Sequence, residues 1–257
     1  MNTNLTGNWL EAAPCENGVR ILAGPSLFAD LYGQVRDAER RLLTDEEVRA
    51  LPNGDALWNA DEWRIRARGA RRLVHVLEQE DRPLKILDVG CGNGWLTNLL
   101  HQQGHMTTGI DAFTAELEQA ARLFPGPDFA RADLITSELP KEHYDVIVFA
   151  ASFQYFADAA GTLARCRELL GARGEVHILD TILYQSRTEV EDARTRSTNY
   201  YAELGFPEMA GHYHMHRLSD VQAAGRCRIL SAPGGMDRTL ARFGRPASPF
   251  THIVVRP

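Results

Sequence analysis

Short hydrophobic runs alternate with stretches of helical periodicity from residue 82 to the end of the chain. The runs are too short for buried helices and are bounded by glycine, proline or charged residues, so they predict strands. The stretches between them repeat apolar residues three and four positions apart, which predicts amphipathic helices. The expected strands are residues 85–89, 106–110, 128–130, 144–150 and 174–180, and the expected helices are residues 95–102, 115–123 and 157–170.

This alternation predicts an α/β fold with a doubly wound, mostly parallel sheet. Residues 225–231 and 251–255 predict a closing pair of strands, so we expect seven strands in total. The run at 144–150 is nearly all apolar, as a central parallel strand should be. Ligands of such sheets bind beyond the carboxyl ends of the strands, and that is where site residues are expected.

Helical segments precede this pattern. Residues 1–24 are polar and are expected to be loosely ordered, whereas residues 25–51 carry an apolar stripe that predicts one helix. Residues 61–79 predict a second helix. We therefore divide the chain into an N-terminal helical extension or lid, residues 1–80, and a ligand-binding domain, residues 81–257.

Composition limits the classes of function. The chain has 257 residues, of which 44% are hydrophobic and 24% charged, as in an ordinary globular protein. Its net charge of −6 argues against a non-specific nucleic-acid binder. The four cysteines are far apart, which favours free thiols in the cytoplasm over a disulfide scaffold or a zinc site. No apolar run is long enough to span a bilayer, so no membrane partner is expected.

A turn with three glycines joins the first strand of the sheet to its helix. Residues 86–97 read Ile-Leu-Asp-Val-Gly-Cys-Gly-Asn-Gly-Trp-Leu-Thr. A dinucleotide site would carry G-x-G-x-x-G, and the acid Asp88 would repel a pyrophosphate. An acid here suits a ligand with an ammonium group. The pattern Asp88-x-Gly90-x-Gly92-x-Gly94 resembles motif I of the class I S-adenosylmethionine (SAM) methyltransferases.

The resemblance implies a Rossmann-like fold of the class I methyltransferase type and S-adenosyl-L-methionine as cofactor. Asp111 follows the second strand, where an acid accepts the ribose hydroxyls. Asp133 follows the third strand, where the family places an acid against the adenine amino group, with Leu134 N–H next to it and Phe113 packing on the ring. The expected cofactor-binding residues are Asp88, Gly90, Cys91, Gly92, Asn93, Gly94, Trp95, Asp111, Ala112, Phe113, Asp133, Leu134 and Ala150.

Arg66 falls inside the apolar stripe of the second predicted helix. A buried guanidinium needs an anion or several acceptors. Two interpretations stay open: a structural salt bridge, or a contact with the carboxylate of SAM or of an acidic substrate. We include Arg66 among the expected cofactor-binding residues.

Residues 181–224 are longer than a simple crossover requires and are rich in tyrosine and histidine. Long insertions in compact domains are usually functional, so this segment predicts an ordered cap after the fifth strand. Its three histidines could bind a metal together with Glu208 or Asp220, although no resident metal is expected. A second interpretation makes at least one histidine a base or hydrogen-bond donor that faces the substrate, and a third leaves them as packing or surface residues. The expected catalytic residues are His214, His212 and Tyr201, and the expected substrate-binding residues are Gln154, Tyr155, Tyr200 and His216.

These features predict an enzyme that transfers a methyl group from SAM to a polar small molecule. A hydroxyl acceptor from a natural-product or saccharide pathway, with a histidine base, is the first hypothesis. The alternatives are an RNA or protein methyltransferase, with the arginines of the second helix as a docking face, and a non-catalytic SAM-binding module. The expected partner is a small-molecule acceptor, and a homodimer is left open.

Overall fold

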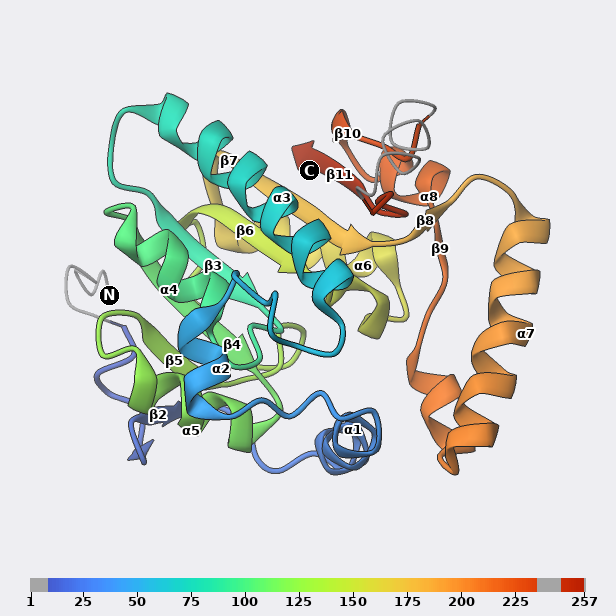
Figure 1. The fold of residues 1–257 in the computed structure, drawn as a ribbon. Helices are drawn as coiled ribbons and strands as arrows, with labels where there is room; N and C mark the ends of the chain where they lie inside the picture. The colour runs from blue at the N-terminus through green and yellow to red at the C-terminus, as the bar shows by residue number, and fades with distance from the viewer. Residues whose placement is uncertain (1–8, 235–245, 257) are drawn as a thin grey trace.

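The computed structural model of the protein describes residues 9–234 and 246–256. Within these residues a nine-stranded sheet forms the centre of the molecule, in the order β1-β2-β5-β4-β3-β6-β7-β11-β10 (Figure 1). The strands are β1 (Cys15–Glu16), β2 (Val19–Ile21), β3 (Lys85–Val89), β4 (Met106–Asp111), β5 (Asp128–Arg131), β6 (Tyr144–Ala150), β7 (Leu170–Thr181), β10 (Arg226–Ser231) and β11 (Thr251–Arg256).

The sheet is mostly parallel, as the sequence predicts. Neighbouring strands from β2 through β5, β4, β3 and β6 to β7 all run in the same direction. Only the outer pairs β1–β2, β7–β11 and β10–β11 are antiparallel. The carboxyl ends of the five central parallel strands therefore share one edge, and the two cofactor acids predicted after β4 and β5 come to that edge.

The expected number of seven strands is wrong because the N-terminal segment joins the sheet. Residues 15–21, expected to be loosely ordered, form the hairpin β1–β2, and β2 pairs with β5 through Arg20 and Ile21. Leu10 and Val19 are fully buried, and their burial stabilises this segment. Residues 1–8 of the same expectation lie outside the described part of the chain.

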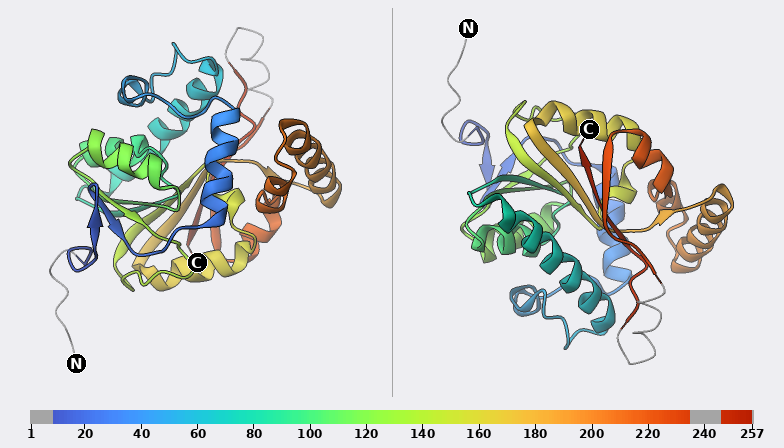
Figure 2. Two further views of the ribbon diagram at one scale, coloured as in Figure 1. Left: turned by 90° about the horizontal axis from the view of Figure 1, so that it is seen from below. Right: turned by 90° about the horizontal axis from the view of Figure 1, so that it is seen from above.

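Helices cover both faces of the sheet (Figure 2). One core joins the first face, through Leu87, Ile147 and Phe149, to α6 and α8. A second core joins the opposite face, through Ile86 and Val148, to α3 and α4. Alternate residues of each strand thus face opposite layers, as the pleat of a buried strand requires. The helices are α1 (Leu27–Ala38), α2 (Asp45–Ala50), α3 (Ala60–Leu77), α4 (Trp95–Gln102), α5 (Thr114–Leu123), α6 (Ala159–Leu169), α7 (Arg187–Leu204) and α8 (Leu218–Ala223), with 3₁₀ turns η1 (Glu78–Glu80), η2 (Phe153–Tyr155) and η3 (Pro207–His212).

The single helix expected at 25–51 is two helices, α1 and α2. Arg40 takes a left-handed conformation, with φ of 56°, and ends the first helix. Thr44 then starts the second helix through a capping box with Glu47. The apolar stripe predicted helix correctly for this segment. The conformation of Arg40 and the cap at Thr44, however, divide the segment into two shorter helices.

The segment after β7 forms a separate arm at one side of the molecule (Figure 1). It holds α7, η3, α8 and a two-stranded sheet of β8 (Leu183–Tyr184) and β9 (His216–Arg217). Val35 of α1 packs with Tyr201 of α7 and Met209 of η3 in a small core of their own. The arm and α1 therefore meet near the carboxyl edge of the sheet. In the described residues, no helix is both long and apolar enough to cross a membrane.

A buried ion pair holds α1 against α5. The Nη2 atom of Arg36 lies 3.1 Å from Oε1 of Glu116, and the two side chains are 18% and 5% exposed. Removing one partner of a buried pair leaves an uncompensated charge, so Glu116→Ala should lower the free energy of unfolding by about 3 kcal/mol. Denaturant unfolding measures this change. The matched control is Asp61→Ala, which breaks the exposed pair with Arg64 and should cause no measurable change. Equal effects of the two variants would contradict a structural role for the buried pair.

Candidate functional site

The loop between β3 and α4 is shaped by its three glycines. Gly90, Gly92 and Gly94 have φ of 70°, 52° and 74°, a region that residues with a Cβ rarely adopt. The N–H groups of Gly90 and Cys91 both donate to the carbonyl of Ile110, at 2.8 and 3.1 Å. The loop is thus tied to the end of the neighbouring strand β4.

The first two glycines also stand where neighbouring side chains leave no space for a Cβ. A Cβ at Gly90 would lie 2.5 Å from Cβ of Ser152, and a Cβ at Gly92 would lie 3.0 Å from Oε2 of Glu116. Side chains therefore close in on the loop backbone from two sides. This bare backbone at a helix start is the kind of surface that a ligand can approach closely.

Asp111 ends β4 beside the glycine loop. Its Oδ2 accepts a hydrogen bond from Gly92 N–H and its Oδ1 accepts one from Phe113 N–H, both at 2.9 Å. Burial raises the pKa of this carboxyl to about 6, and the two backbone donors oppose the rise. A carboxylate has about four acceptor positions, so lone pairs remain for two hydroxyl donors of a ribose.

Asp88 is directed toward α4. Its Oδ2 accepts a hydrogen bond of 2.7 Å from the hydroxyl of Thr97, and the residue is only 2% exposed. Burial raises its pKa to about 7, which the Thr97 hydroxyl partly offsets. Asp88 therefore lies behind the glycine loop, where it stabilises the connection of β3 to α4.

Asp133 forms a turn at the end of β5. Its Oδ1 accepts hydrogen bonds from the N–H groups of Ile135 and Thr136, at 2.9 and 2.7 Å. Arg165 donates to the carbonyl of Leu134 at 3.1 Å, which fixes the backbone next to the acid. The second carboxylate oxygen of Asp133 makes none of these turn contacts.

A cavity of about 830 Å³ lies at this carboxyl edge. Its volume falls within the range of sites for small molecules and cofactors. The predicted residues that line it are Gly90, Asp111, Ala112, Phe113, Asp133, Leu134 and Tyr155. The other predicted cofactor residues are not among those that line it: Asp88, Cys91, Gly92, Asn93, Gly94, Trp95, Ala150 and Arg66.

Two walls of the cavity were not expected from the sequence. Phe28 and Tyr32 of α1 form one wall, and Ser152, whose hydroxyl donates to the carbonyl of Val89, forms part of another. The sequence predicts an N-terminal lid and shows the apolar stripe of α1, but it did not indicate which side chains of that stripe would line the cavity. Gly161 and Thr162 of α6 also line it.

Arg66, Gln154 and Tyr200 have hydrogen-bond partners within the chain. The Nη2 atom of Arg66 lies 2.6 Å from Oε1 of Glu62, the salt bridge that the sequence left open. The side chain of Gln154 donates to the carbonyl of Ala151 and accepts from Thr181. The hydroxyl of Tyr200 donates to Glu39 at 2.6 Å.

The three cap histidines point to different places. His212 packs on Phe28, with ring centroids 5.1 Å apart, whereas His216 is buried against Phe153. Tyr213 packs on Tyr155, and since neighbours in an extended chain face opposite sides, His214 faces away from Tyr155. In the described residues, no group of three or more His, Cys, Asp or Glu side chains could hold a metal ion.

Tyr201 is buried and lies with its ring 6.2 Å from that of Tyr213. Burial raises the pKa of its hydroxyl, so this group stays protonated at neutral pH. The hydroxyl can therefore donate a hydrogen bond but is a poor candidate for a base.

Affinity for S-adenosylhomocysteine, the demethylated cofactor, should fall as pH drops through about 6, because protonation of Asp111 removes an acceptor. The folded-state pKa lies above the ordinary value of about 3.9, so the folded chain takes up this proton first. Stability of the free protein should therefore rise over the same interval while affinity falls. Calorimetry across this range measures both trends.

Asp111→Asn should weaken binding of S-adenosylhomocysteine by roughly 1.5–3 kcal/mol at neutral pH. It should also remove the fall in affinity with pH, here called the pH step, because the amide cannot titrate. Asp88→Asn is the control, since Asp88 lies behind the loop and its replacement should leave the step in place. A pH step that persists in Asp111→Asn would contradict this assignment.

The doubly wound sheet, the glycine loop and the two acids at successive strand ends define a Rossmann-like domain with a ligand site at the carboxyl edge of its sheet. Known proteins agree with this class. Residues 87–178 match the family described as methyltransferase domain. That stretch runs from β3 to β7 and contains the glycine loop, Asp111 and Asp133.

Two curated relatives share this region. The chain is 33% identical over 116 residues to a malonyl-[acyl-carrier protein] O-methyltransferase of Acetivibrio thermocellus, covering 43% of the chain and 41% of the relative. It is 35% identical over 98 residues to a ubiquinone biosynthesis O-methyltransferase of Saccharophagus degradans, covering 36% and 41%. The match therefore spans about two fifths of the length of these relatives.

A solved structure extends the likeness of fold. The magnesium protoporphyrin IX methyltransferase from Synechocystis PCC 6803, with S-adenosylhomocysteine bound, superposes with a TM-score of 0.56. The match covers 87% of this chain and 99% of that one at 16% sequence identity. Residues 87–178 therefore form a methyltransferase domain, and the solved structure shows that its fold extends over most of the chain.

Proposed function

We propose that the protein transfers a methyl group from SAM to a small polar molecule, with oxygen as the accepting atom. The observation that carries this proposal is the cavity at the carboxyl edge, in which Gly90, Asp111 and Asp133 come together under the aromatic residues of α1. Both curated relatives described above are named as O-methyltransferases. Malonyl-[acyl-carrier protein] and ubiquinone biosynthesis belong to the names of those relatives, and neither is proposed for this chain.

The residues of the cavity fit the cofactor. Asp111 would bind the ribose hydroxyls with its remaining lone pairs, and Asp133 would accept from the adenine amino group. Phe113 would pack on the adenine, and the backbone of Gly90, which lines the cavity, would lie against the amino-acid part. When bound there, SAM supplies a methyl group on a positively charged sulfur.

An aromatic cluster beside this cavity supports an acceptor site there. We define the cluster as Phe28, Tyr32, Tyr155, His212 and Tyr213, whose ring centroids lie 5.1 to 5.9 Å from a neighbour in the group. Three of them line the cavity or border it from α1 and η2. Apolar rings exclude water, and a dry site strengthens the interactions that orient the acceptor.

His212 is the proposed base. A hydroxyl acceptor must lose its proton as it accepts the methyl group, and a neutral imidazole can take it. His212 packs on Phe28, which lines the cavity. Holding the acceptor oxygen near the methyl group supplies the rest of the rate through proximity.

The arginines of α3 give no support to the alternative of RNA or protein methylation. Arg64 is paired with Asp55 and Asp61, at 2.9 and 2.7 Å, and Arg66 is paired with Glu62. The four free cysteines are in keeping with the proposed cytoplasmic location.

Transfer of labelled methyl tests the proposal. The purified chain is incubated with methyl-labelled SAM and a bacterial extract split by ultrafiltration into small molecules and polymers. We expect label in the small-molecule fraction with the native chain, and little with Asp111→Asn. Label confined to the polymer fraction would favour the macromolecular alternative. Binding of S-adenosylhomocysteine without transfer to either fraction would favour the non-catalytic module.

A further inference from the structure

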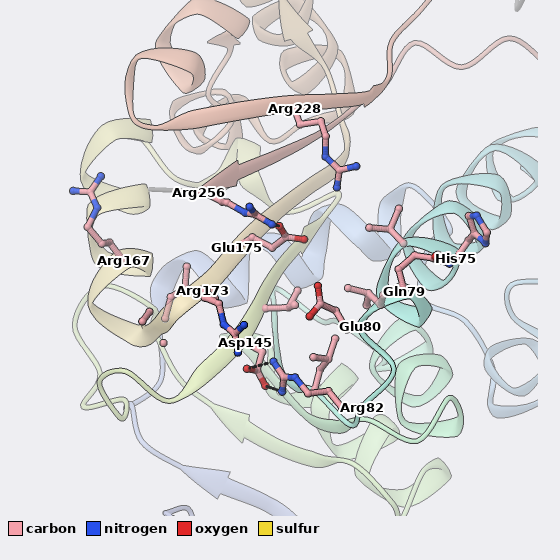
Figure 3. Close-up of a pocket in the computed structure, with 18 residues that line it drawn as sticks. His75, Gln79, Glu80, Arg82, Asp145, Arg167, Arg173, Glu175, Arg228 and Arg256 are labelled. Carbon is pink, nitrogen blue, oxygen red and sulfur yellow. Dashed lines mark hydrogen bonds and ion pairs between the residues drawn. The ribbon is translucent and has the colours of Figure 1, made fainter.

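A second cavity, also of about 830 Å³, lies at the opposite edge of the sheet (Figure 3). It is lined where β3 and β6 begin, by Leu84 and Asp145, and by Glu175 of β7. The cofactor cavity lies at the other ends of β3 and β6. The two cavities are thus separated by the length of the central strands.

Basic side chains outnumber acidic ones around this second cavity. Five arginines line it, against three carboxylates, in a chain whose net charge is −6. The arginines come from four strands or helices and from the turn before β3. They are Arg82, Arg167, Arg173, Arg228 and Arg256.

Two of the three carboxylates are already engaged. Asp145 accepts two hydrogen bonds from the guanidinium of Arg82, at 2.8 and 3.1 Å, and a third from Lys85 N–H. Glu175 pairs with Arg256 at 3.1 Å and with His177 at 3.0 Å. These acids therefore neutralise Arg82 and Arg256 and have little capacity left for a further cation.

Arg173 and Arg228 keep their donors free. Neither guanidinium has a hydrogen bond or an ion pair with another described residue, and Arg167 donates only to the backbone carbonyl of Ala224. Both line the cavity, and Figure 3 shows Arg228 entering it from β10 on one side and Arg173 extending from β7 toward Asp145 on another. Like charges that converge on one concave site are stabilised by an anion placed between them.

We propose that this cavity binds a small phosphorylated molecule with at least two phosphate groups. The planar guanidinium fork matches phosphate oxygens bidentately, and two unpaired forks suit two such groups. Leu77, Leu84 and Val146 provide an apolar wall for an organic part. The third carboxylate, Glu80, can accept from a hydroxyl of that part. A concave site on a negatively charged chain favours a small molecule over nucleic acid.

The site is tested with inorganic pyrophosphate as the probe. Calorimetry is done on the full chain with saturating S-adenosylhomocysteine, so that the cofactor cavity is filled. We expect one saturable site per chain. Arg173→Gln and Arg228→Gln should each raise the dissociation constant about tenfold, the loss expected of one charge-assisted contact.

Arg187→Gln is the matched control, because Arg187 is an exposed arginine that lies outside the cavity. It removes the same charge and should leave the dissociation constant unchanged. Since all three side chains are exposed, thermal unfolding should be the same for every variant. Absence of saturable binding, or equal weakening in Arg187→Gln, would overturn the proposal. This binding measurement does not depend on methyl transfer, so its outcome is independent of whether the proposed reaction is correct.

Discussion

Gly90→Ala is expected to lower the affinity for S-adenosylhomocysteine by about one to two orders of magnitude. Two costs add at this position. A left-handed backbone costs a residue with a Cβ about 1–2 kcal/mol. The new methyl would also lie 2.5 Å from Cβ of Ser152, and overpacking of this kind costs about 1–3 kcal/mol. This clash is relieved only if the loop or Ser152 moves. Because Gly90 and Ser152 both line the cavity, either movement changes its shape. Calorimetry measures the affinity.

Gly104→Ala separates these two costs. Gly104 has φ of 89°, but a Cβ there meets nothing within 4 Å. This variant should therefore carry only the backbone cost and should bind S-adenosylhomocysteine with the affinity of the native chain. Comparable affinity losses in both variants would show that general destabilisation, rather than closure of the cavity, is responsible. Native affinity in Gly90→Ala would mean that the loop does not approach the cofactor.

His212→Ala should reduce turnover by roughly 10²–10⁴-fold, the usual contribution of a general base. Affinity for S-adenosylhomocysteine should change little, because His212 is not among the residues that line the cofactor cavity. The activity is followed with the acceptor found in the labelling experiment.

His214→Ala is the matched control. Its backbone N–H donates to the carbonyl of Gln154 at 2.7 Å, which the substitution preserves, and its side chain faces away from Tyr155. Burial lowers the pKa of this imidazole, so it also stays neutral at pH 7. Similar losses in the two variants would point to disturbance of the arm. Full activity in both would leave proximity and exclusion of water as the mechanism.

Local patterns predicted the central elements closely. β3, α4 and β6 begin and end at the residues expected from the sequence, because each is bounded by glycine or by a change from apolar to polar positions. Asp111 and Asp133 were located for the same reason. In a parallel sheet, the residue that follows a strand is carried to the ligand edge whatever the rest of the chain does.

Patterns failed where contacts distant in sequence decide the structure. The strands β1 and β2 are too short to show periodicity, and they form because β5 offers an open edge with which β2 pairs. The helix expected at 25–51 was divided by the conformation of Arg40 and the cap at Thr44. Similarly, His212 and His216 look alike in sequence, yet one packs on α1 and the other on Phe153.

The sequence by itself determined the class of this protein. The order of strands and helices, the Asp88-x-Gly90-x-Gly92-x-Gly94 turn and the acids after β4 and β5 are local features, and local features follow from residue type and spacing. Only the tertiary structure decided which side chains meet across the chain. It paired Asp88 with Thr97, set Tyr32 against the cavity and brought Arg173 and Arg228 to one site. Such contacts depend on how layers pack, and packing is fixed by the burial of the whole core rather than by any single stretch.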